Sequence, residues 1–418
     1  MEEQFNVRFI TFSDGERYPV LLDNQKQPHW YATLYATTQL RNASKAPNTI
    51  AVVLAAIRIL YSWCFTRGQD LETRFSERNF LNEQELESIR SYTQIRTNES
   101  DKNKVINLSR KVEKKRAMFK SCEERISSGT QYIRITYIAD YLEWLALRLV
   151  ERDARQVDAV TFETIKRMAN GLRVLRPQKK MRSRERARKG LTEELQKTLL
   201  DVVQPGSTGN PFSQEFQIRN QLIVLLLYHL GLRAGELLSL RVSDFDFIKN
   251  TVLVARRHDN PGDNRTYQPV AKTMDRCIPI SESLIKAVSN YVMGDRRRFS
   301  AAKRHEYLFV VHQPGPFAGQ PISLKGLAKV FQEIQAIDSD LFSHLTPHAL
   351  RHTANDRFSA LMDKRGVSPA EEEKMRSYLM GWKEGSGSAG TYTRRHVERK
   401  AREAALLLQE PLQGGNHV

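Results

Sequence analysis

The chain has 418 residues, of which 40% are hydrophobic and 27% charged, a composition that is typical of folded globular proteins and excludes a disordered chain. At this length we expect two or three domains, each with its own core. The 65 Lys and Arg residues exceed the 48 Asp and Glu residues, and the resulting formal charge of +17 favours a polyanionic partner, nucleic acid before a ribosome-associated or membrane-surface role.

Residues 1–175 predict a short β-like arm followed by a helical domain. Residues 1–45 contain two β-like runs around the turn signal SDGE. From residue 46 to 175 apolar residues recur at three- and four-residue steps, as in PNTIAVVLAAIRILYSWCFTRG, where Gly68 stands at a plausible helix C-cap. The stretches TYIADYLEWLALRLVERD and DAVTFETIKRMANGLRVL have the same periodicity.

Residues 176–190, RPQKKMRSRERARKG, form a basic run in which eight of fifteen residues are Lys or Arg. Such a run cannot bury itself, so it is either a solvated linker or a strap along a phosphate backbone. In the second interpretation the DNA-binding residues are Arg176, Lys179, Lys180, Arg182, Arg184, Arg186, Arg188 and Lys189.

Residues 191–410 predict a second, mixed domain, followed by a tail at 411–418. Helices are expected at TEELQKTLLDVV and FSQEFQIRNQLIVLLLYHLGL. The stretch TVLVARRHDNPGDNRTYQPVAKTMDRCIPI predicts strands around a Pro/Gly/Asn/Asp loop, and helices return up to VERKAREAALLLQE. The expected fold class is therefore mainly α with a small antiparallel β-sheet.

A signal peptide, a membrane span or a disulfide pattern in the sequence would indicate the cellular compartment. The N-terminal stretch MEEQFNVRFI does not have the pattern of a signal peptide, and the apolar run LIVLLLYHLGL is shorter than the ~20 residues that span a bilayer. Cys64, Cys122 and Cys277 are an odd number without paired spacing, which argues against a disulfide framework or a cysteine-rich zinc site. We expect a cytoplasmic protein with reduced thiols and no membrane partner.

The stretch TPHALRHTAND contains a cluster that could hold a metal. His348 and His352 have the i, i+4 spacing of the zinc-protease helix. That motif needs a Glu directly after the first His, whereas here the position is Ala349, and Arg351 would repel a dication. No metal is expected.

An anion fits the same cluster better. Thr346 is a good N-cap and Pro347 suits the first helical position, so His348 and Arg351 would lie in the first turn. Free backbone N–H groups and the positive end of the helix dipole favour a phosphate there. For His352 we prefer a packing role beneath the site.

A second arginine occurs in YHLGLRAGELLSL. Arg233 follows an apolar helix, and Glu236 lies one turn further on. An arginine that leaves a buried segment needs a partner, which either Glu236 or a ligand phosphate could supply.

Together, GLRAGELLSL and PHALRH resemble the paired-arginine signature of the tyrosine recombinase, or phage integrase, family. That family has a lysine on a β-hairpin between the two arginine boxes, and AKTMDRCIPI offers Lys272. It then has a His or Trp after a Gly, followed by a nucleophilic tyrosine; YLMGWKEGSGSAGTYTRR offers Trp382 and Tyr392, a slightly longer spacing than is usual. The resemblance implies a helical core-binding domain over 46–175 and a mixed α/β catalytic domain over 191–410.

The resemblance also implies a reaction without cofactors. Tyr392 would attack a DNA phosphate to form a 3′-phosphotyrosyl bond, which a 5′-hydroxyl later attacks to rejoin strands. Arg233 and Arg351 would grip the non-bridging oxygens, and His348 would bind the same phosphate and assist proton transfer.

The remaining residues would have supporting roles. Lys272 would protonate the leaving 5′ oxygen, Trp382 would position and pack, and Glu236 would orient Arg233. Tyr378 is the nearest rival nucleophile, but its place in SYLMGW predicts a core position on a helix.

The expected function is site-specific recombination of double-stranded DNA for integration or excision of a mobile element in a bacterium or phage. The implied partners are recombination sites, further copies of the chain in dimers and tetramers, and accessory DNA-bending proteins or a partner recombinase. Two alternatives stay open: a type IB topoisomerase-like enzyme, and a catalytically impaired DNA-binding protein of the same fold.

Overall fold

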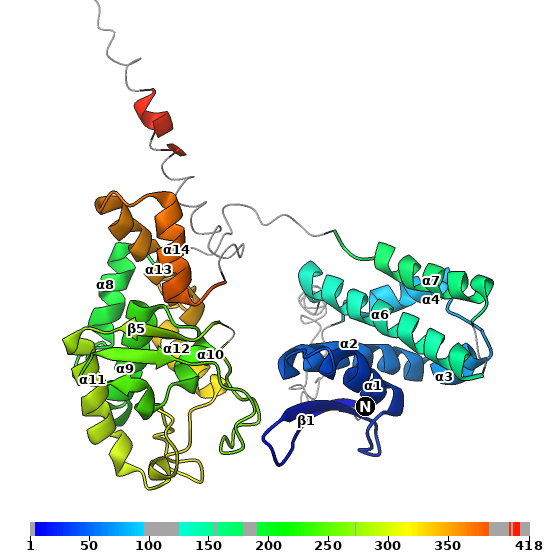
Figure 1. The fold of residues 1–418 in the computed structure, drawn as a ribbon, viewed down its shortest axis with the longest axis horizontal. Coiled ribbons are helices and arrows are strands. Elements are labelled where there is room, and N and C mark those ends of the chain that lie inside the picture. The colour runs from blue at the N-terminus through cyan, green and yellow to red at the C-terminus, as the bar shows by residue number, and fades with distance from the viewer. Residues whose placement is uncertain are drawn as a thin grey trace, which may run out of the picture. The chain divides into compact units, whose positions relative to one another are not determined.

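The computed structural model describes residues 5–95, 125–153, 157–178, 190–271, 273–383, 401–402 and 404–409. It divides into two compact units, Met1–Phe12 with Arg17–Ser183, and Ser13–Glu16 with Arg184–Val418. The division falls inside the basic run 176–190. Helices dominate both units and two small antiparallel sheets complete them, so the predicted fold class is confirmed (Figure 1).

The first unit begins with a β-hairpin that belongs to its core. Strands β1 (Asn6–Thr11) and β2 (Arg17–Leu22) pair in register from Asn6↔Leu22 to Thr11↔Arg17 around the SDGE turn. Tyr18, Val20 and Leu21 are buried in the same core as the helices, so the hairpin is packed on the unit and is not an appended arm.

The rest of the segment expected to be β-like is helical. Helix α1 (Trp30–Tyr35) continues into a π-helical turn at Ala36–Arg41. The side chain of His29 caps α1 by accepting a hydrogen bond from the backbone N–H of Ala32. This cap is the local reason for a helix, because a ring nitrogen here replaces the usual hydroxyl or carboxylate that sequence patterns detect.

The helical core of the first unit consists of α2 (Pro47–Thr66), α3 (Leu71–Ser76), α4 (Glu83–Tyr92), α6 (Ser128–Asp153) and α7 (Ala159–Val174). Helix α2 is long and apolar enough to cross a membrane, but 61% of its most apolar window is buried among the other helices of the unit. It is the central helix of a protein core.

The second unit surrounds a long apolar helix. Its elements are α8 (Glu193–Val202), α9 (Gln214–Leu230), α10 (Ala234–Ser239), β3 (Phe245–Asp246), β4 (Thr251–Val254), β5 (Arg276–Pro279), α11 (Glu282–Met293), α12 (Leu324–Gln335), α13 (Pro347–Lys364) and α14 (Pro369–Met380). Strands β3, β4 and β5 form one antiparallel sheet in that order. Short 3-10 turns occur at Val242–Asp244, Arg296–Arg298 and Ala301–Arg304.

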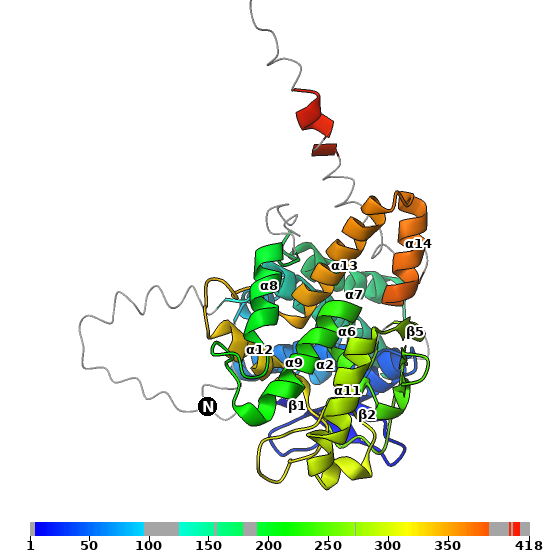
Figure 2. The ribbon, with the colours of Figure 1, turned by 90° about the vertical axis from the view of Figure 1, so that its left-hand side faces the viewer.

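Four chain segments meet at one end of this unit. Helix α13 packs on α9, α14 packs on α13, and β5 contacts α14 (Figure 2). Helix α9 ends at Gly231 in the left-handed conformation (φ 60°), which turns the chain into α10. A Cβ at Gly231 would lie 3.0 Å from Met380 Cε and 3.1 Å from Ala354 Cβ, so a larger residue would require these side chains on α14 and α13 to shift by a few tenths of an ångström.

The close approach at Gly231 can be measured against a second glycine. We expect Gly231→Ala to cost the second unit about 2 kcal/mol or more of unfolding free energy, through the left-handed backbone and the crowded Cβ. Gly206→Ala is the matched control, because Gly206 also has a positive φ (79°) but nothing within 4 Å of an added Cβ. Equal losses in urea denaturation of the two variants would contradict the packing argument.

Candidate active site

The centre of the site is a buried carboxylate on the short helix α10. Arg233 is the N-cap of this helix, and Glu236 accepts hydrogen bonds from the Arg233 backbone N–H and from its Nη1, both at 3.1 Å. The side chain of Glu236 is fully buried, whereas that of Arg233 is 31% exposed. The turn after α9 therefore holds the guanidinium of Arg233 at the edge of the core.

Glu236 also contacts two further arginines. Arg276 Nη2 on β5 donates to its Oε2 at 2.7 Å, and Arg351 Nη1 on α13 lies 3.7 Å from the same oxygen. The Thr273 hydroxyl donates to Oε1 at 2.9 Å. Burial acts to raise the pKa of Glu236, but the charges of Arg276 and Arg351 outweigh it and hold the pKa below its ordinary value.

This arrangement leaves unbalanced positive charge. Within the described residues, three guanidinium groups surround one ionised carboxylate, an excess of two positive charges at neutral pH. A desolvated excess of this kind is unfavourable in the free protein and favours a bound anion.

Arg351 joins the ends of two helices. Its Nη1 donates to the Gly231 carbonyl at 2.6 Å, at the end of α9, and its Nη2 donates to the Met380 carbonyl at 3.1 Å, at the end of α14. The guanidinium lies 5.3 Å from the ring centroid of Trp382, which is itself buried. The residue is only 1% exposed, so Arg351 is part of the core as well as of the charged cluster.

The two histidines of α13 differ in exposure. Thr346 Oγ1 accepts a hydrogen bond from the Ala349 N–H at 3.0 Å and Pro347 is the first helical residue, so the expected helix start forms. His348 in the first turn is exposed and His352 is buried, with their rings 4.5 Å apart in an edge-to-face contact. The exposed ring is therefore supported from below by the buried one.

The last part of the site is attached through Gly381. This residue ends α14 in the left-handed conformation, and its carbonyl accepts a hydrogen bond from the Met274 N–H at 3.0 Å. Arg276 Nε donates to the Leu379 carbonyl at 2.7 Å. A Cβ at Gly381 would lie 2.8 Å from Arg276 Nη1, so the glycine allows the end of α14, and hence Trp382, to reach the approach to β5.

Sequence reasoning missed Arg276 and Thr273. Arg276 is 4% exposed and alternates along β5 with exposed Cys277 and buried Ile278. This alternation was a usable signal, because a strand residue two positions from a buried isoleucine points to the same side and a charge there needs a partner. Tyr378 is also placed differently from the prediction: it is 62% exposed, so the assignment to the core was wrong.

Several residues that the sequence analysis singled out fall between the ranges that the structure describes. Lys272 and Tyr392 lie outside the described residues, as do Lys179, Lys180, Arg182, Arg184, Arg186, Arg188 and Lys189. Arg176 is described: its Nε donates to the Arg173 carbonyl at 2.7 Å and its guanidinium lies 4.9 Å from the ring centroid of Tyr132. Among the residues that the structure describes, no group of three or more His, Cys, Asp or Glu side chains could hold a metal.

The role of Arg276 can be tested by stability. We expect Arg276→Met to destabilise the second unit by about 3 kcal/mol, because it removes a charge partner of buried Glu236 and leaves the Leu379 carbonyl without its donor. Arg298→Met is the matched control: Arg298 pairs with Asp295 but is 72% exposed, and its loss should cost less than about 1 kcal/mol. Chemical denaturation measures the unfolding free energy of both variants. Similar losses of stability would show that Arg276 is not an essential partner of Glu236.

The lowered pKa of Glu236 predicts how stability depends on pH. A carboxyl with a lowered folded-state pKa stabilises the protein above its ordinary value of 4.5 and loses this contribution as the pH falls through the folded-state pKa. We expect Glu236→Gln to be about 3 kcal/mol less stable than the parent at pH 7, with the difference shrinking in acid below pH 4.5. A difference that is constant down to the acid transition would show that the carboxylate charge is unimportant.

Several known proteins are similar to this chain in sequence. Tyrosine recombinase XerA of Pyrococcus furiosus is 32% identical over 179 residues, which cover 43% of this chain and 49% of the relative. Tyrosine recombinase XerD of Halalkalibacterium halodurans is 28% identical over 138 residues, covering 33% and 40%. Transposase A from transposon Tn554 of Staphylococcus aureus is 25% identical over 314 residues, covering 75% of each chain. The match thus spans less than half of the two Xer relatives.

Solved structures include distant neighbours. XerH site-specific recombinase bound to palindromic difH substrate is 13% identical with a TM-score of 0.40, covering 86% of this chain and 96% of that one. The Tn1549 transposon integrase in complex with a circular intermediate DNA is 18% identical with a TM-score of 0.39, covering 68% and 97%.

The phage integrase family model matches residues 189–401, just over half of the sequence, and the chain therefore belongs to the phage integrase family.

Proposed function

We propose that this chain is a site-specific DNA recombinase that cuts and rejoins strands through a covalent bond between Tyr392 and a DNA 3′-phosphate. The observation that carries the proposal is the cluster of Arg233, Arg276 and Arg351 around the single carboxylate of Glu236. Its excess of positive charge is what a phosphodiester needs when charge gathers on its non-bridging oxygens.

The cluster contains both solvent-accessible and buried side chains. His348 is exposed and Arg233 is partly exposed, so these two members would make the first contacts with DNA. Arg351 is buried and already donates to two carbonyl groups, so its guanidinium must become accessible as DNA binds before it can contact a phosphate oxygen. Glu236 and Arg276 fix the positions of the other charges.

The chemistry conserves the energy of the phosphodiester. The Tyr392 phenolate oxygen forms a bond to phosphorus as the bond from phosphorus to the 5′ oxygen breaks, and Lys272 gives that oxygen its proton. His348 accepts or relays the phenol proton, because a tyrosine with an ordinary pKa near 10 is a weak nucleophile at neutral pH. A 5′-hydroxyl then reverses the step, so neither ATP nor a metal ion is required.

The proposed partners follow from charge and from the relatives. The substrate is double-stranded DNA carrying recombination sites of a mobile element, since one relative is a transposon's transposase and others are tyrosine recombinases. The basic run 176–190 would lie along the DNA backbone. Leu406, Leu407 and Leu408 are between 57% and 78% exposed, which fits assembly with a neighbouring copy into dimers and tetramers in the cytoplasm of a bacterial host.

Covalent trapping tests the nucleophile. On a DNA duplex with a 5′-bridging phosphorothiolate at the crossover site, the parent protein should form a protein–DNA adduct, and Tyr392→Phe should reduce it about 1,000-fold or more. Tyr378→Phe is the control, because Tyr378 is exposed on α14 and lacks a proposed role in the reaction. An adduct that depends on Tyr378 would overturn the assignment.

Two further assays, DNA binding and plasmid relaxation, separate the alternative functions. Sequence-specific binding without an adduct on any substrate would identify a DNA-binding protein that has lost catalysis. Relaxation of supercoiled plasmids regardless of their sequence would identify a topoisomerase-like enzyme.

A further inference from the structure

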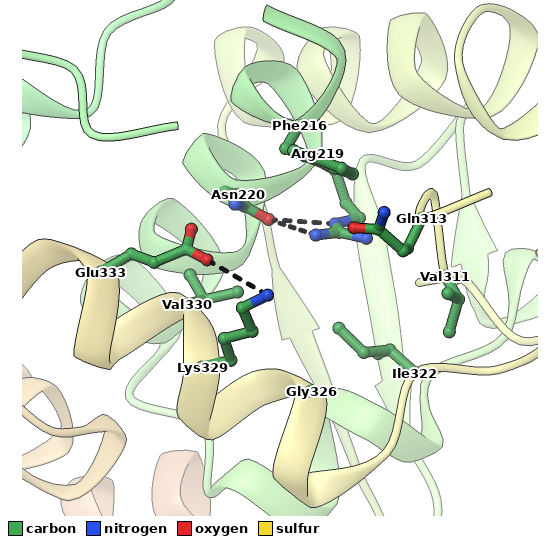
Figure 3. Close-up of a pocket in the computed structure, with 10 residues that line it drawn as sticks. All are labelled: Phe216, Arg219, Asn220, Val311, Gln313, Ile322, Gly326, Lys329, Val330 and Glu333. Carbon is green, nitrogen blue, oxygen red and sulfur yellow. Dashed lines mark hydrogen bonds and ion pairs between the residues drawn. The ribbon is translucent and has the colours of Figure 1, made fainter. Parts of the chain in front are cut away.

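A cavity of about 120 Å³ lies in the second unit, away from the charged cluster. It is open on one side and is lined by the first turns of α9, by Val311, Gln313 and Ile322, and by one face of α12 (Figure 3). Arg219 lines it from the second turn of α9, eleven residues before that helix ends at Leu230, which is about 16 Å along the helix axis. The cavity is therefore a separate feature from the proposed DNA site.

Arg219 is a buried cation with neutral partners. It is 7% exposed, and its Nε and Nη2 donate to Asn220 Oδ1 at 3.0 and 2.8 Å, while its Nη1 donates to the Val310 carbonyl at 3.0 Å. Within the described part of the chain it makes no ion pair. Burial lowers the pKa of the guanidinium, although the nearby Tyr291 and Glu333 act to raise it.

The guanidinium keeps donors for a ligand. An arginine has five N–H donors, and Arg219 uses three of them. One N–H on each terminal nitrogen remains, and the two oxygens of a carboxylate can accept hydrogen bonds from such groups. In Figure 3 the Arg219 side chain reaches into the space that the lining residues enclose.

The charges around the cavity favour a monoanion. Lys329 and Glu333 on α12 pair with each other at 3.8 Å and cancel, so Arg219 contributes the net charge of +1. A phosphate dianion would overcompensate this charge and would lie close to the Glu333 carboxylate. A carboxylate balances it.

The walls favour a short apolar stem. Val311, Ile322 and Val330 line the cavity together with the ring of Phe216. These side chains give a ligand apolar surface to bury, while the small volume excludes a large one.

We propose that this cavity binds a carboxylate carried on a short apolar stem, with the carboxylate held end-on by Arg219. The carboxylate can belong to a free small acid or to an acidic side chain of a peptide. Both sources share the same chemistry and differ in what surrounds the stem outside the cavity.

Methyl NMR of the full chain tests the site directly. With labelled Ile and Val methyl groups, Ile322, Val311 and Val330 report on the cavity walls. We expect saturable shifts of these signals on titration with sodium butyrate or with a blocked peptide, acetyl-Gly-Glu-Gly-amide, at constant ionic strength. The tighter of the two ligands identifies the natural source.

Three variants make the result decisive. Arg219→Gln should weaken binding at least 10-fold, and Val311→Phe, which keeps the arginine and fills the cavity, should do the same. Arg297→Gln removes an exposed arginine of the same unit and should leave binding unchanged. If Arg219→Gln does not fold, the comparison of Val311→Phe with Arg297→Gln still decides.

The inference is overturned if neither carboxylate gives saturable shifts, or if Val311→Phe and Arg219→Gln bind as the parent does. It is also overturned if inorganic phosphate binds as tightly as butyrate, because the charge argument is then wrong. None of these outcomes bears on covalent trapping by Tyr392.

Discussion

The buried carboxylate of Glu236 is the constraint on which the second unit depends. It contacts Arg233 from the turn after α9, Arg276 from β5 and Arg351 from α13, so a single ionised group joins three segments that are distant in the sequence. A neutral residue there would leave these cations to repel one another in a low-dielectric interior. The ion pairs of Glu236 therefore hold together the same chain segments that form the candidate site.

Two glycines make this convergence sterically possible. Gly231 lets α13 and α14 approach the end of α9, and Gly381 lets the end of α14 approach Arg276. Each has a left-handed backbone, and each offers its carbonyl to the network, Gly231 to Arg351 and Gly381 to the Met274 N–H. Both glycines thus provide space, and Gly231 also provides an acceptor that fixes Arg351.

Much of this could be predicted from the sequence, for identifiable reasons. Several helices have apolar residues at three- and four-residue steps, and the helix start at Thr346-Pro347 depends on local chemistry alone, so these elements formed as expected. Arg233 and Glu236 are three residues apart, and their contact follows from helix geometry. By contrast, Arg276 finds its partners 40 and 103 positions away, and a single sequence does not reveal such pairings.

The wrong expectations have a common physical cause. Residues 30–41 became helical through a histidine cap and packing on the first unit, and Tyr378 became exposed because α14 turns another face to α13. Packing contacts, which sequence periodicity does not encode, contributed to both outcomes, and the His29 cap added a local cause for α1. The burial of Arg351 is a related case, because a motif predicts which residue is present and not how far it is from solvent.

The difference in exposure between Arg233 and Arg351 bears on how the proposed site would engage DNA. Desolvated positive charge costs the free protein stability, since one carboxylate does not neutralise three guanidinium groups. A phosphate that arrives at the exposed edge, Arg233 and His348, supplies the missing negative charge and lowers that cost. In the proposed function, the free energy that this excess of positive charge costs the free protein would be recovered on binding, and it would thus contribute to affinity for a phosphodiester.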